Sequence, residues 1–238
     1  LLYESLNEPD ESRAYVLIAY RLTEEVIDEA DEKKCAMIIT YIPPWLEAQK
    51  RMTIDGPLKL IAKCASLSIS IIGVHTALDT VEGGINDWVI TTFNCNIESA
   101  SPIEKCKGAT ASEEEAGVGL GRLVRLSDEI CANDAMDWII RATRMGGLTA
   151  AYAERDARTV AVSVNSCYDA ISKLPEAPGL IITGEMTRQQ VLNCHSRGSP
   201  VIMLDNCKTE SHYLQEIFSK KLGKSLGEGI KIVNIRYD

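Results

Sequence analysis

The sequence lacks three things: abundant aromatic residues, an excess of basic charge, and any long apolar run. Aromatic residues make up only 5% of the 238 positions. No stretch approaches the roughly 18 consecutive apolar residues of a membrane helix, so we expect no membrane span. The net charge of −9 disfavours a broad phosphate-binding surface, so we expect no DNA partner. No secretory signal peptide is recognisable.

The cysteines lack the C-x-x-C pairing that zinc ribbons need, which disfavours such a site. Several lie among apolar residues, and we expect reduced, mostly buried thiols in a cytoplasmic protein. Cys194 precedes His195, but neighbouring side chains on a helix point apart, so we do not expect a catalytic pair there. The eight cysteines are Cys35, Cys64, Cys95, Cys106, Cys131, Cys167, Cys194 and Cys207.

The hydrophobic content of 45% is enough for one large domain or two small lobes with a core. An apolar strand over 15–20 is followed by a helix that Thr23 caps, and the next strand is expected over 35–40. This spacing predicts parallel strands joined by a right-handed crossover. Further strands are expected over 67–74, 122–126, 148–152, 158–164, 180–183, 200–204 and 230–235, and further helices from Pro57, from 127 or 128 to about Met145, over 187–193 and over 211–221.

The segment 96–121 changes character and is interpreted as a linker and hairpin into a second lobe. It contains turn-forming dipeptides and the acidic run Glu113-Glu114-Glu115. Its G-x-G-x-G sequence over 117–121 is similar to a phosphate loop. A dinucleotide-binding loop requires a helix after the glycines, and a strand is expected here instead.

Polar residues follow the apolar strand over 67–74. That strand ends at His75, and Asp79 lies four residues further on. Gly83-Gly84 then breaks the chain, and Asn86 is placed to cap the helix that follows. Because α/β proteins build sites at the carboxyl ends of their strands, this is a candidate site. The alternative is a plain connection in which His75 and Asp79 satisfy loop backbone groups.

Several short blocks, spread over nearly the whole chain, carry a recognisable pattern. The clearest runs from His75-Thr-Ala-Leu-Asp79 to Gly83-Gly-Ile-Asn86. The other blocks are 22–26 (LTEEV), 39–44 (ITYIPP), 50–53 (KRMT), 117–119 (GVG), 183–186 (TGEM) and 205–210 (DNCKTE). In this order they resemble the H-T-x-x-D, G-G-V-N, Y-H-P-P, T-G-E-M-S-H-H and G-H-x-x-T-E motifs of the Nif-three-like family, whose members are also known as GTP cyclohydrolase I type 2 homologues.

The resemblance implies an α/β fold of two interleaved lobes, three-layered α/β/α, with mixed, mostly parallel sheets. We expect residues 1–105 with 196–238 to form the first lobe, which carries the H-T-x-x-D and D-N-x-x-T-E segments, and residues 106–195 to form the second. The resemblance also implies a ring-shaped hexamer and a two-metal cluster lined by imidazole and carboxylate groups. Such a metal pair can activate water for hydrolysis.

This sequence departs from the family pattern at the metal-ligand positions. The histidine of Y-H-P-P is Ile42, which cannot coordinate a metal. The paired histidines of S-H-H are Arg188 and Gln189. The histidine of G-H-x-x-T-E is Asn206, a weak ligand through its amide oxygen.

Asp79, Glu210 and Asn206 form the remnant metal-ligand set that the resemblance implies. Two carboxylates and an amide suit Mg²⁺ or Ca²⁺ with water molecules, and suit zinc or iron poorly. We therefore expect either no cofactor or a weakly held divalent cation. The pocket residues expected around this set are His75, Tyr41, Ile42 and Arg188.

The two carboxylates of this set also have a structural interpretation. Asp79 and Glu210 can bond loop amides or cap helices. Arg188 can pair with one of them in place of the metal charge, since buried carboxylates need a compensating partner. This hypothesis predicts the Arg188 guanidinium within hydrogen-bonding distance of a carboxylate.

Three functions remain open. The ligand losses favour a non-catalytic scaffold or binding protein, a homo-oligomer with a protein partner. The second is a residual metal-dependent hydrolase that acts on a nucleotide or another phosphate-bearing small molecule. The third is a factor bound to a larger assembly such as a ribonucleoprotein, with Lys220, Lys221 and Lys224 as its contact face.

Overall fold

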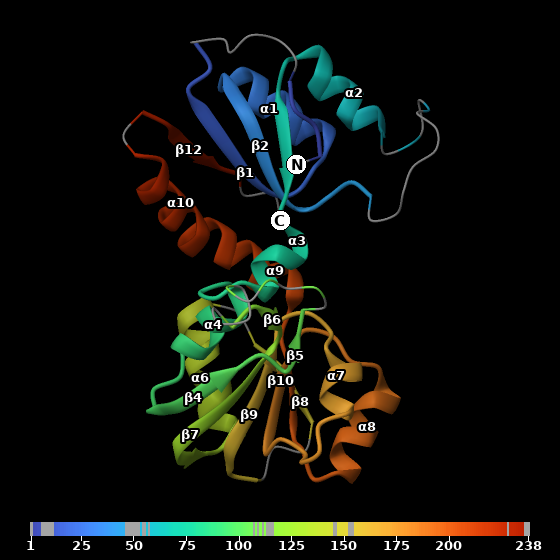
Figure 1. The fold of residues 1–238 in the computed structure, drawn as a ribbon, viewed down its shortest axis with the longest axis vertical. Coiled ribbons are helices and arrows are strands. Elements are labelled where there is room, and N and C mark those ends of the chain that lie inside the picture. The colour runs from blue at the N-terminus through green and yellow to red at the C-terminus, as the bar shows by residue number, and fades with distance from the viewer. Residues whose placement is uncertain are drawn as a thin grey trace. The chain divides into compact units, whose positions relative to one another are not determined.

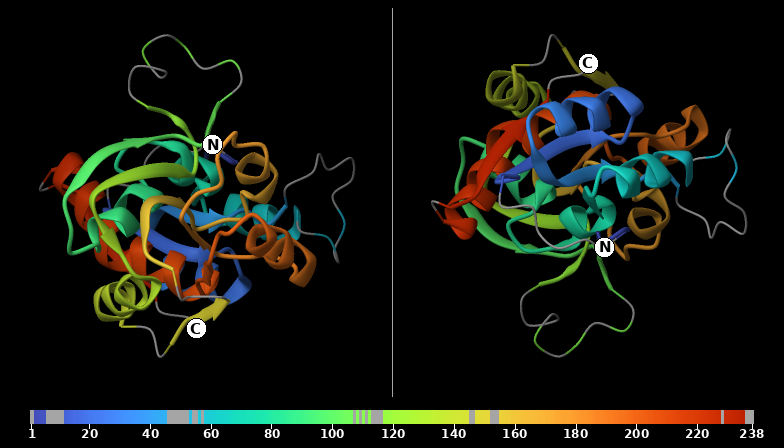
Figure 2. Two further views of the ribbon diagram at one scale, coloured as in Figure 1. Left: turned by 90° about the horizontal axis from the view of Figure 1, so that it is seen from below. Right: turned by 90° about the horizontal axis from the view of Figure 1, so that it is seen from above.

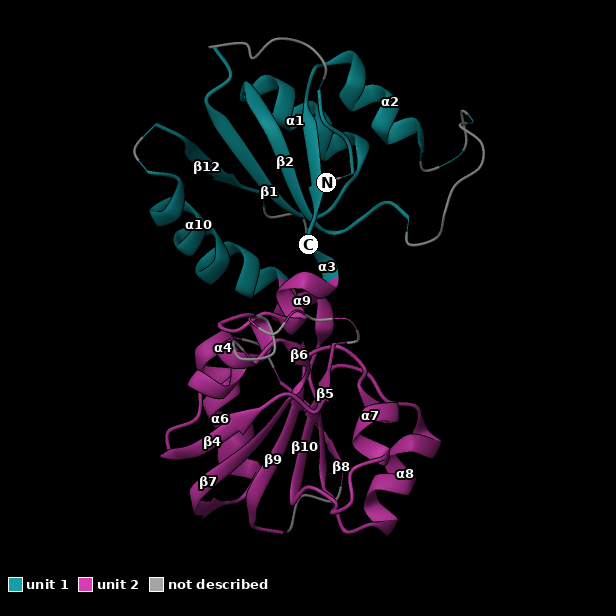
Figure 3. Cartoon of the chain, in the orientation of Figure 1, with its two compact units in different colours: residues 1–75, 211–238 teal, residues 76–210 magenta. Residues whose placement is uncertain are grey.

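The chain forms two compact units that alternate along the sequence. The computed structural model describes residues 2–5, 12–45, 53, 56, 58–106, 108, 110, 112, 117–144, 147–151, 155–227 and 229–235. Unit 1 comprises Leu1–His75 and Ser211–Asp238, and unit 2 comprises Thr76–Glu210 (Figure 3). The lobe boundaries expected after 105 and after 195 both fall inside unit 2.

Unit 1 is built on a four-stranded sheet in the order β12-β1-β2-β3, with every neighbouring pair parallel. Helices α1 and α2 share a core with one face of this sheet, and η1 packs against β1 (Figure 1). Its elements are β1 (Tyr15–Arg21), α1 (Glu24–Glu32), β2 (Cys35–Ile42), α2 (Leu58–Ser66), β3 (Ser70–Gly73), the π-helical turn η1 (Tyr213–Phe218), α10 (Ser219–Leu226) and β12 (Lys231–Asn234).

The β-α-β unit predicted at the start of the chain is confirmed. β1 and β2 pair in parallel, and α1 connects them. The helix begins where the sequence indicates, because the hydroxyl of Thr23 accepts a hydrogen bond from Val26 N at 3.3 Å. Val26, Ile27 and Ala30 then face the core. The predicted α/β class with parallel-rich sheets therefore holds.

Unit 2 is built on a six-stranded sheet in the order β4-β7-β9-β10-β11-β8. β9, β10 and β11 are parallel, and the other neighbouring pairs are antiparallel. Its elements are α3 (His75–Thr80), α4 (Ile85–Thr91), β4 (Ile97–Ser101), β5 (Glu104–Lys105), β6 (Gly119–Leu120), β7 (Arg122–Ile130), α6 (Ala132–Thr143), β8 (Thr149–Ala151), β9 (Ala157–Ser163), α7 (Tyr168–Ser172), β10 (Leu180–Thr183), α8 (Arg188–Ser196), β11 (Val201–Met203) and α9 (Asn206–His212), of which α3 and α9 extend across the unit boundaries.

Helices cover both faces of this sheet. Residues of α7 and α8 share a core with Ala161, Ile181 and Val201 of the parallel strands. On the other side, the ring of Phe93, which follows α4, lies 6.4 Å from the ring of Trp138 in α6. The two helix pairs flank the strands in Figure 1. Unit 2 is therefore a three-layer α/β/α arrangement.

The described residues of the segment 96–121 include three strands of unit 2, which is not the linker expected there. β4 pairs with β7 inside the six-stranded sheet, so its backbone groups belong to the ladder. β5 pairs with β6, which confirms the hairpin, and these two strands lead away from the sheet (Figure 2). Gly121 has a φ of 57°, and a Cβ there would lie 3.0 Å from Val162 O, so this position requires glycine. The predicted strand after it is β7, as expected.

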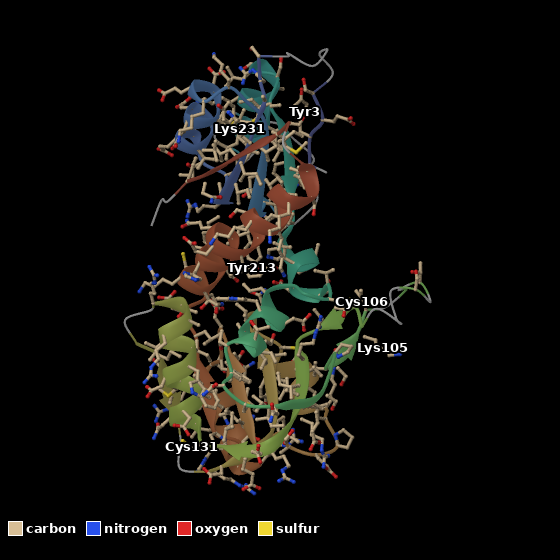
Figure 4. All side chains as sticks on the ribbon, turned by 90° about the vertical axis from the view of Figure 1, so that its left-hand side faces the viewer. Tyr3, Lys105, Cys106, Cys131, Tyr213 and Lys231 are labelled. Carbon is tan, nitrogen blue, oxygen red and sulfur yellow. The ribbon has the colours of Figure 1, made fainter. Side chains whose placement is uncertain are left out.

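Two helix starts predicted from the sequence are wrong. Residues 127–130 continue β7, and α6 begins only at Ala132. Cys131, which is labelled in Figure 4, caps α6, because its thiol accepts a hydrogen bond from Asp134 N at 3.3 Å. The single helix expected over 211–221 is instead part of a run formed by α9, η1 and α10. The expected features at Pro57, 50–52, 113–115, Met145 and Tyr152 lie outside the described residues.

Within the described ranges, no helix combines the length and the apolar character needed to cross a membrane. All eight cysteines are free, and four of them are buried: Cys35, Cys64, Cys167 and Cys194.

Because of these buried thiols, we expect the folded chain to lose stability at alkaline pH. Burial raises the pKa of Cys64 from 9.0 to about 12, and that of Cys35 to about 11. The folded chain therefore holds these protons more tightly than the unfolded chain. Their contribution to the free energy of unfolding is fully present below pH 9.0 and is lost as the pH rises toward 11.

The urea concentration at the unfolding midpoint of the natural chain should therefore decrease as the pH is raised from 9.0 to 11. A Cys35→Ala/Cys64→Ala variant should show a smaller fall over the same range, since it lacks both groups. An identical fall in the two proteins would contradict the assignment.

Candidate functional site

The candidate site lies at the carboxyl edge of the parallel strands of unit 2. β9, β10 and β11 end at the same edge of the sheet. Asn165 follows β9, Gly184 follows β10, and Asn206 follows β11 as the first residue of α9. Gly184 N donates to Ser163 O at 3.1 Å, which ties the ends of β9 and β10 together.

Asp79 belongs to this edge and reaches it from α3. It is 3% exposed, and its Oδ2 accepts a hydrogen bond from Asn165 Nδ2 at 2.6 Å. Its main-chain oxygen accepts a second bond from Asn86 Nδ2 at 2.8 Å. Asn86 Oδ1 in turn accepts from Val164 N at 2.8 Å. Asn86 therefore bridges α3 to the end of β9.

The predicted capping role of Asn86 is wrong for this reason. The N-cap of α4 is Gly84, and the helix begins at Ile85. The amide of Asn86, which is 1% exposed, is committed to the two long-range bonds just described. A buried amide gains more from two satisfied partners than from a single local cap.

Arg122 holds the connection between α3 and α4 in place. It is 3% exposed, and its Nε donates to Asp87 Oδ1 at 2.6 Å. Asp87 Oδ2 accepts from Gly83 N at 2.6 Å, so the ion pair also fixes the glycine turn. The other acceptors of the guanidinium are the main-chain oxygens of Thr80, Val81, Gly119 and Gly121.

Asn206 and Glu210 lie one helical turn apart in α9. Glu210 is 3% exposed. Asn206 Oδ1 is buried and, among the described residues, has no hydrogen-bond partner. A Cβ on Gly184 would lie 1.6 Å from this oxygen and 1.8 Å from Val164 O. The carboxamide is therefore seated directly on the Cα of Gly184.

Arg188 does not neutralise the buried carboxylates. It is exposed at the start of α8, and the contacts of the described residues include no ion pair between Arg188 and Asp79 or Glu210. Thr187 and Gln190 form a capping box around the helix start, which leaves the Arg188 side chain on the outside. In place of the predicted Arg188, the neutral amide of Asn165 is a partner of Asp79.

The expected pocket residues His75, Tyr41 and Ile42 belong to unit 1. The rings of Tyr41 and His75 lie 5.8 Å apart, and Tyr41 stacks on Tyr20 at 6.1 Å. Tyr41 is 1% exposed, so it packs in the core. His75 has a φ of 26°, at the point where the chain passes from unit 1 to unit 2.

The lysines expected to form a basic face are exposed on α10 of unit 1. Lys220 Nζ pairs with a Glu216 carboxylate oxygen at 3.1 Å. This acidic neighbour reduces the positive charge that the face presents.

The chemistry available at the edge of unit 2 is that of neutral amides and two buried carboxylates. The hydroxyl of Ser163 donates to Asn165 O at 2.7 Å and so supports the turn. Burial raises the pKa of the neighbouring Cys167, which keeps that thiol protonated and weakly nucleophilic at neutral pH. In the part of the chain that the structure describes, no three His, Cys, Asp or Glu side chains are arranged to hold a metal ion.

Asn165 is a site residue that the sequence reasoning missed. It stands directly after the predicted strand over 158–164, so the rule that sites form at strand ends applies to it as well as to His75. The position of Asn165 after a strand could therefore have identified it as a site residue. Its pairing with Asp79 follows only from the fold.

Comparisons with known proteins agree with the fold and the motifs. The family model of Duf34/NIF3 (NGG1p interacting factor 3) matches residues 5–238. NIF3-like protein 1 of Drosophila melanogaster is 31% identical over 216 residues, which cover 90% of this chain and 70% of that protein. The GTP cyclohydrolase 1 type 2 homolog of Clostridium acetobutylicum is 34% identical over 134 residues, which cover 56% of this chain and 47% of that protein. The crystal structure of a Bacillus cereus protein related to NIF3 has a TM-score of 0.74 at 17% identity, and the match covers 99% of this chain and 90% of that one. The chain therefore belongs to the Duf34/NIF3 family.

Proposed function

We propose that this chain is a non-catalytic scaffold or binding member of its family, which has lost most of the metal ligands that the family resemblance implies. The observation that carries the proposal is the 2.6 Å hydrogen bond from Asn165 Nδ2 to Asp79 Oδ2. A carboxylate that ligates metal ions directs its lone pairs at cations. Here one of its oxygens is satisfied by a neutral amide of the same unit.

The residues present do not fit the family's metal pair. Ile42 offers no donor atom, Arg188 is a cation, and Gln189 is exposed on α8. Asn206 offers one amide oxygen, which is a weak ligand for zinc or iron. Its carboxamide is seated against Gly184 and Val164 O.

Metal content tests this proposal. We expect mass spectrometry of the natural protein to find far fewer transition-metal ions than chains, also after incubation with Zn²⁺, Fe²⁺ or Mn²⁺. A variant with Ile42→His, Arg188→His, Gln189→His and Asn206→His restores imidazole at the four departed positions and should bind more metal. Stoichiometric transition metal in the natural chain would overturn the proposal.

The second candidate is a residual metal-dependent hydrolase. It is favoured by Asp79 and Glu210, which are retained and each 3% exposed. The name of the Clostridium acetobutylicum relative supports a nucleotide such as GTP as the substrate to try. Turnover of GTP that requires Mg²⁺ and disappears in a folded Glu210→Gln variant would establish this function. Absence of turnover in the natural chain would favour the scaffold.

We also propose a cytoplasmic homo-oligomer with a protein partner. The family resemblance supports the ring-shaped hexamer, and the family description as an interacting factor supports a protein partner. Four buried free thiols suit a reducing compartment. Native mass spectrometry of the same samples should give the mass of six chains, and a monomer mass would contradict the ring.

A further inference from the structure

The carboxamide of Asn206 faces a main-chain oxygen. A Cβ added to Gly184 would lie 1.6 Å from Asn206 Oδ1 and 1.8 Å from Val164 O. The distance between these two oxygens therefore cannot exceed the sum of the two distances. Both atoms are hydrogen-bond acceptors, and Val164 is fully buried. Two buried acceptors in contact repel each other and leave Asn206 Oδ1 without a donor.

The two ends of a carboxamide have nearly the same shape, and rotation about its terminal torsion exchanges them. With the nitrogen placed toward Gly184, the amide would donate to Val164 O in the same space. The oxygen of Asn206 is the only side-chain atom that is both buried and without a partner among the described residues. Exchanging the two ends therefore satisfies the buried end and creates no second buried defect.

We propose that Asn206 Nδ2 donates a hydrogen bond to Val164 O, so that Asn206 is a positioning residue for the end of β9. Asn86 Oδ1 already accepts from Val164 N at 2.8 Å. Two side-chain amides then hold both polar groups of Val164. We call this pair, Asn86 and Asn206, the amide clamp.

The amide clamp determines where Asn165 lies. Asn165 is the residue after Val164, and its Nδ2 meets Asp79 Oδ2 at 2.6 Å. Asn86 also bonds the main-chain oxygen of Asp79 at 2.8 Å. Three amides thus fix the segment around Asp79, where the resemblance implies a metal pair. The inference rests on the proposed function in one respect, which is that no metal competes for the Asn206 amide.

Substitution of Asn206 by aspartate tests the clamp. Asn206→Asp keeps the shape of the side chain, removes the donor and places a carboxylate against Val164 O. The melting temperature should fall by about 5 °C, because a buried hydrogen bond is lost and an acceptor is left unsatisfied. The matched control is Asn133→Asp, which adds the same charge at an exposed position of α6 and should shift the melting temperature by about 1 °C at most. Equal shifts in the two variants would overturn the clamp.

Added cations separate the clamp from a cation site. If Asn206 Oδ1 and Val164 O shared a cation, the aspartate variant would gain stability when Mg²⁺, Ca²⁺ or Mn²⁺ is added. The clamp predicts no such gain, so a gain would overturn it. Metal content of the natural chain tests the proposed function alone. Low metal content together with an unaffected Asn206→Asp variant would retain the scaffold and reject the clamp.

Nuclear magnetic resonance of the natural chain gives a readout that needs no variant. The side-chain amide protons of Asn206 should exchange slowly with solvent and lie close to the α-protons of Gly184. Their signals are assigned by their loss in the Asn206→Asp spectrum. Rapid exchange, or an amide that is remote from Gly184, would overturn the proposal.

Discussion

Replacement of Arg122 by methionine should lower the free energy of unfolding of unit 2 by about 4 kcal/mol. The guanidinium is the only charge partner described for the Asp87 side chain, at 2.6 Å, and the side chain of Arg122 is 4% exposed. Methionine fills a similar volume but leaves Asp87 without its cation. It also leaves four main-chain oxygens, those of Thr80, Val81, Gly119 and Gly121, without the donors that Arg122 supplies.

The neighbouring Arg125 provides the control. It lies on the same strand and pairs with Glu98 at 3.2 Å, but the two side chains are 61% and 46% exposed. Arg125→Met should therefore cost about 0.5 kcal/mol. Arg122→Lys should fall between the two, since lysine keeps the charge and loses the planar fork that reaches several acceptors.

Urea unfolding followed by tryptophan fluorescence, to which Trp88, a buried residue of α4, contributes, measures these differences. Similar midpoints for the Arg122→Met and Arg125→Met variants would show that the buried network does not hold the connection between α3 and α4. The Arg122→Met variant should also loosen Asp79 and Asn86, which flank that connection. It should therefore raise the rate of hydrogen exchange at Val164 N, from which Asn86 Oδ1 accepts a hydrogen bond.

The strands that could be predicted are those whose own residues form a continuous apolar run, because such a run indicates burial. Parallel strands covered on both faces form continuous apolar runs, and the runs over 15–20, 35–40 and 180–183 are of this kind. β4 has the sequence Ile-Glu-Ser-Ala-Ser and is exposed at every residue. Nothing in that composition indicates a strand, and only its pairing with β7 makes it one. The expected lobe boundary after 105 likewise falls inside unit 2, to which β4 belongs.

The helix start expected at 127 illustrates a second limit. Ser127-Asp128-Glu129 has the composition of a helix N-terminus, yet these residues extend β7. Ser127 N donates to Asn96 O at 3.0 Å, and that partner is remote in the sequence. Local capping preferences are worth about 1 kcal/mol, so a ladder of long-range bonds overrides them.

The site shows the same division between residue type and partner. The motif identified Asp79, Asn86 and Asn206 as special positions, and all three lie at the carboxyl edge of β9, β10 and β11. Their partners were not predictable. Asn86 bonds Val164, which is 78 residues away, and Asp79 bonds Asn165, which is 86 residues away. The sequence suggested Arg188 as the partner because the charges of residues can be read from the sequence. Which strand ends lie next to each other is known only from the fold.

Gly184→Ala should destabilise unit 2 by about 3 kcal/mol or more. The added Cβ would lie 1.6 Å from Asn206 Oδ1 and 1.8 Å from Val164 O, far inside van der Waals contact. The Asn206 side chain can rotate away, but Val164 O belongs to the backbone. Gly184 N is itself bonded to Ser163 O at 3.1 Å, so the ends of β9 and β10 must separate to admit a methyl group.

Gly147→Ala is the matched control, since it adds the same methyl group in the same unit and meets no atom within 4 Å. Its effect on the free energy of unfolding should stay within about 0.5 kcal/mol. Similar urea midpoints for the two alanine variants would mean that the ends of β9 and β10 adjust freely.

The double variant Gly184→Ala/Asn206→Ala divides the cost between its two sources. Removing the carboxamide relieves the contact with Asn206 and leaves the contact with Val164 O. The double variant should therefore be less destabilised than the sum of the two single variants, with a coupling of about 1 kcal/mol or more. It should still unfold at lower urea than Asn206→Ala alone, because the backbone overlap persists. Recovery to the midpoint of Asn206→Ala would show instead that the side chain of Asn206, and not the backbone of β9, requires a glycine at 184.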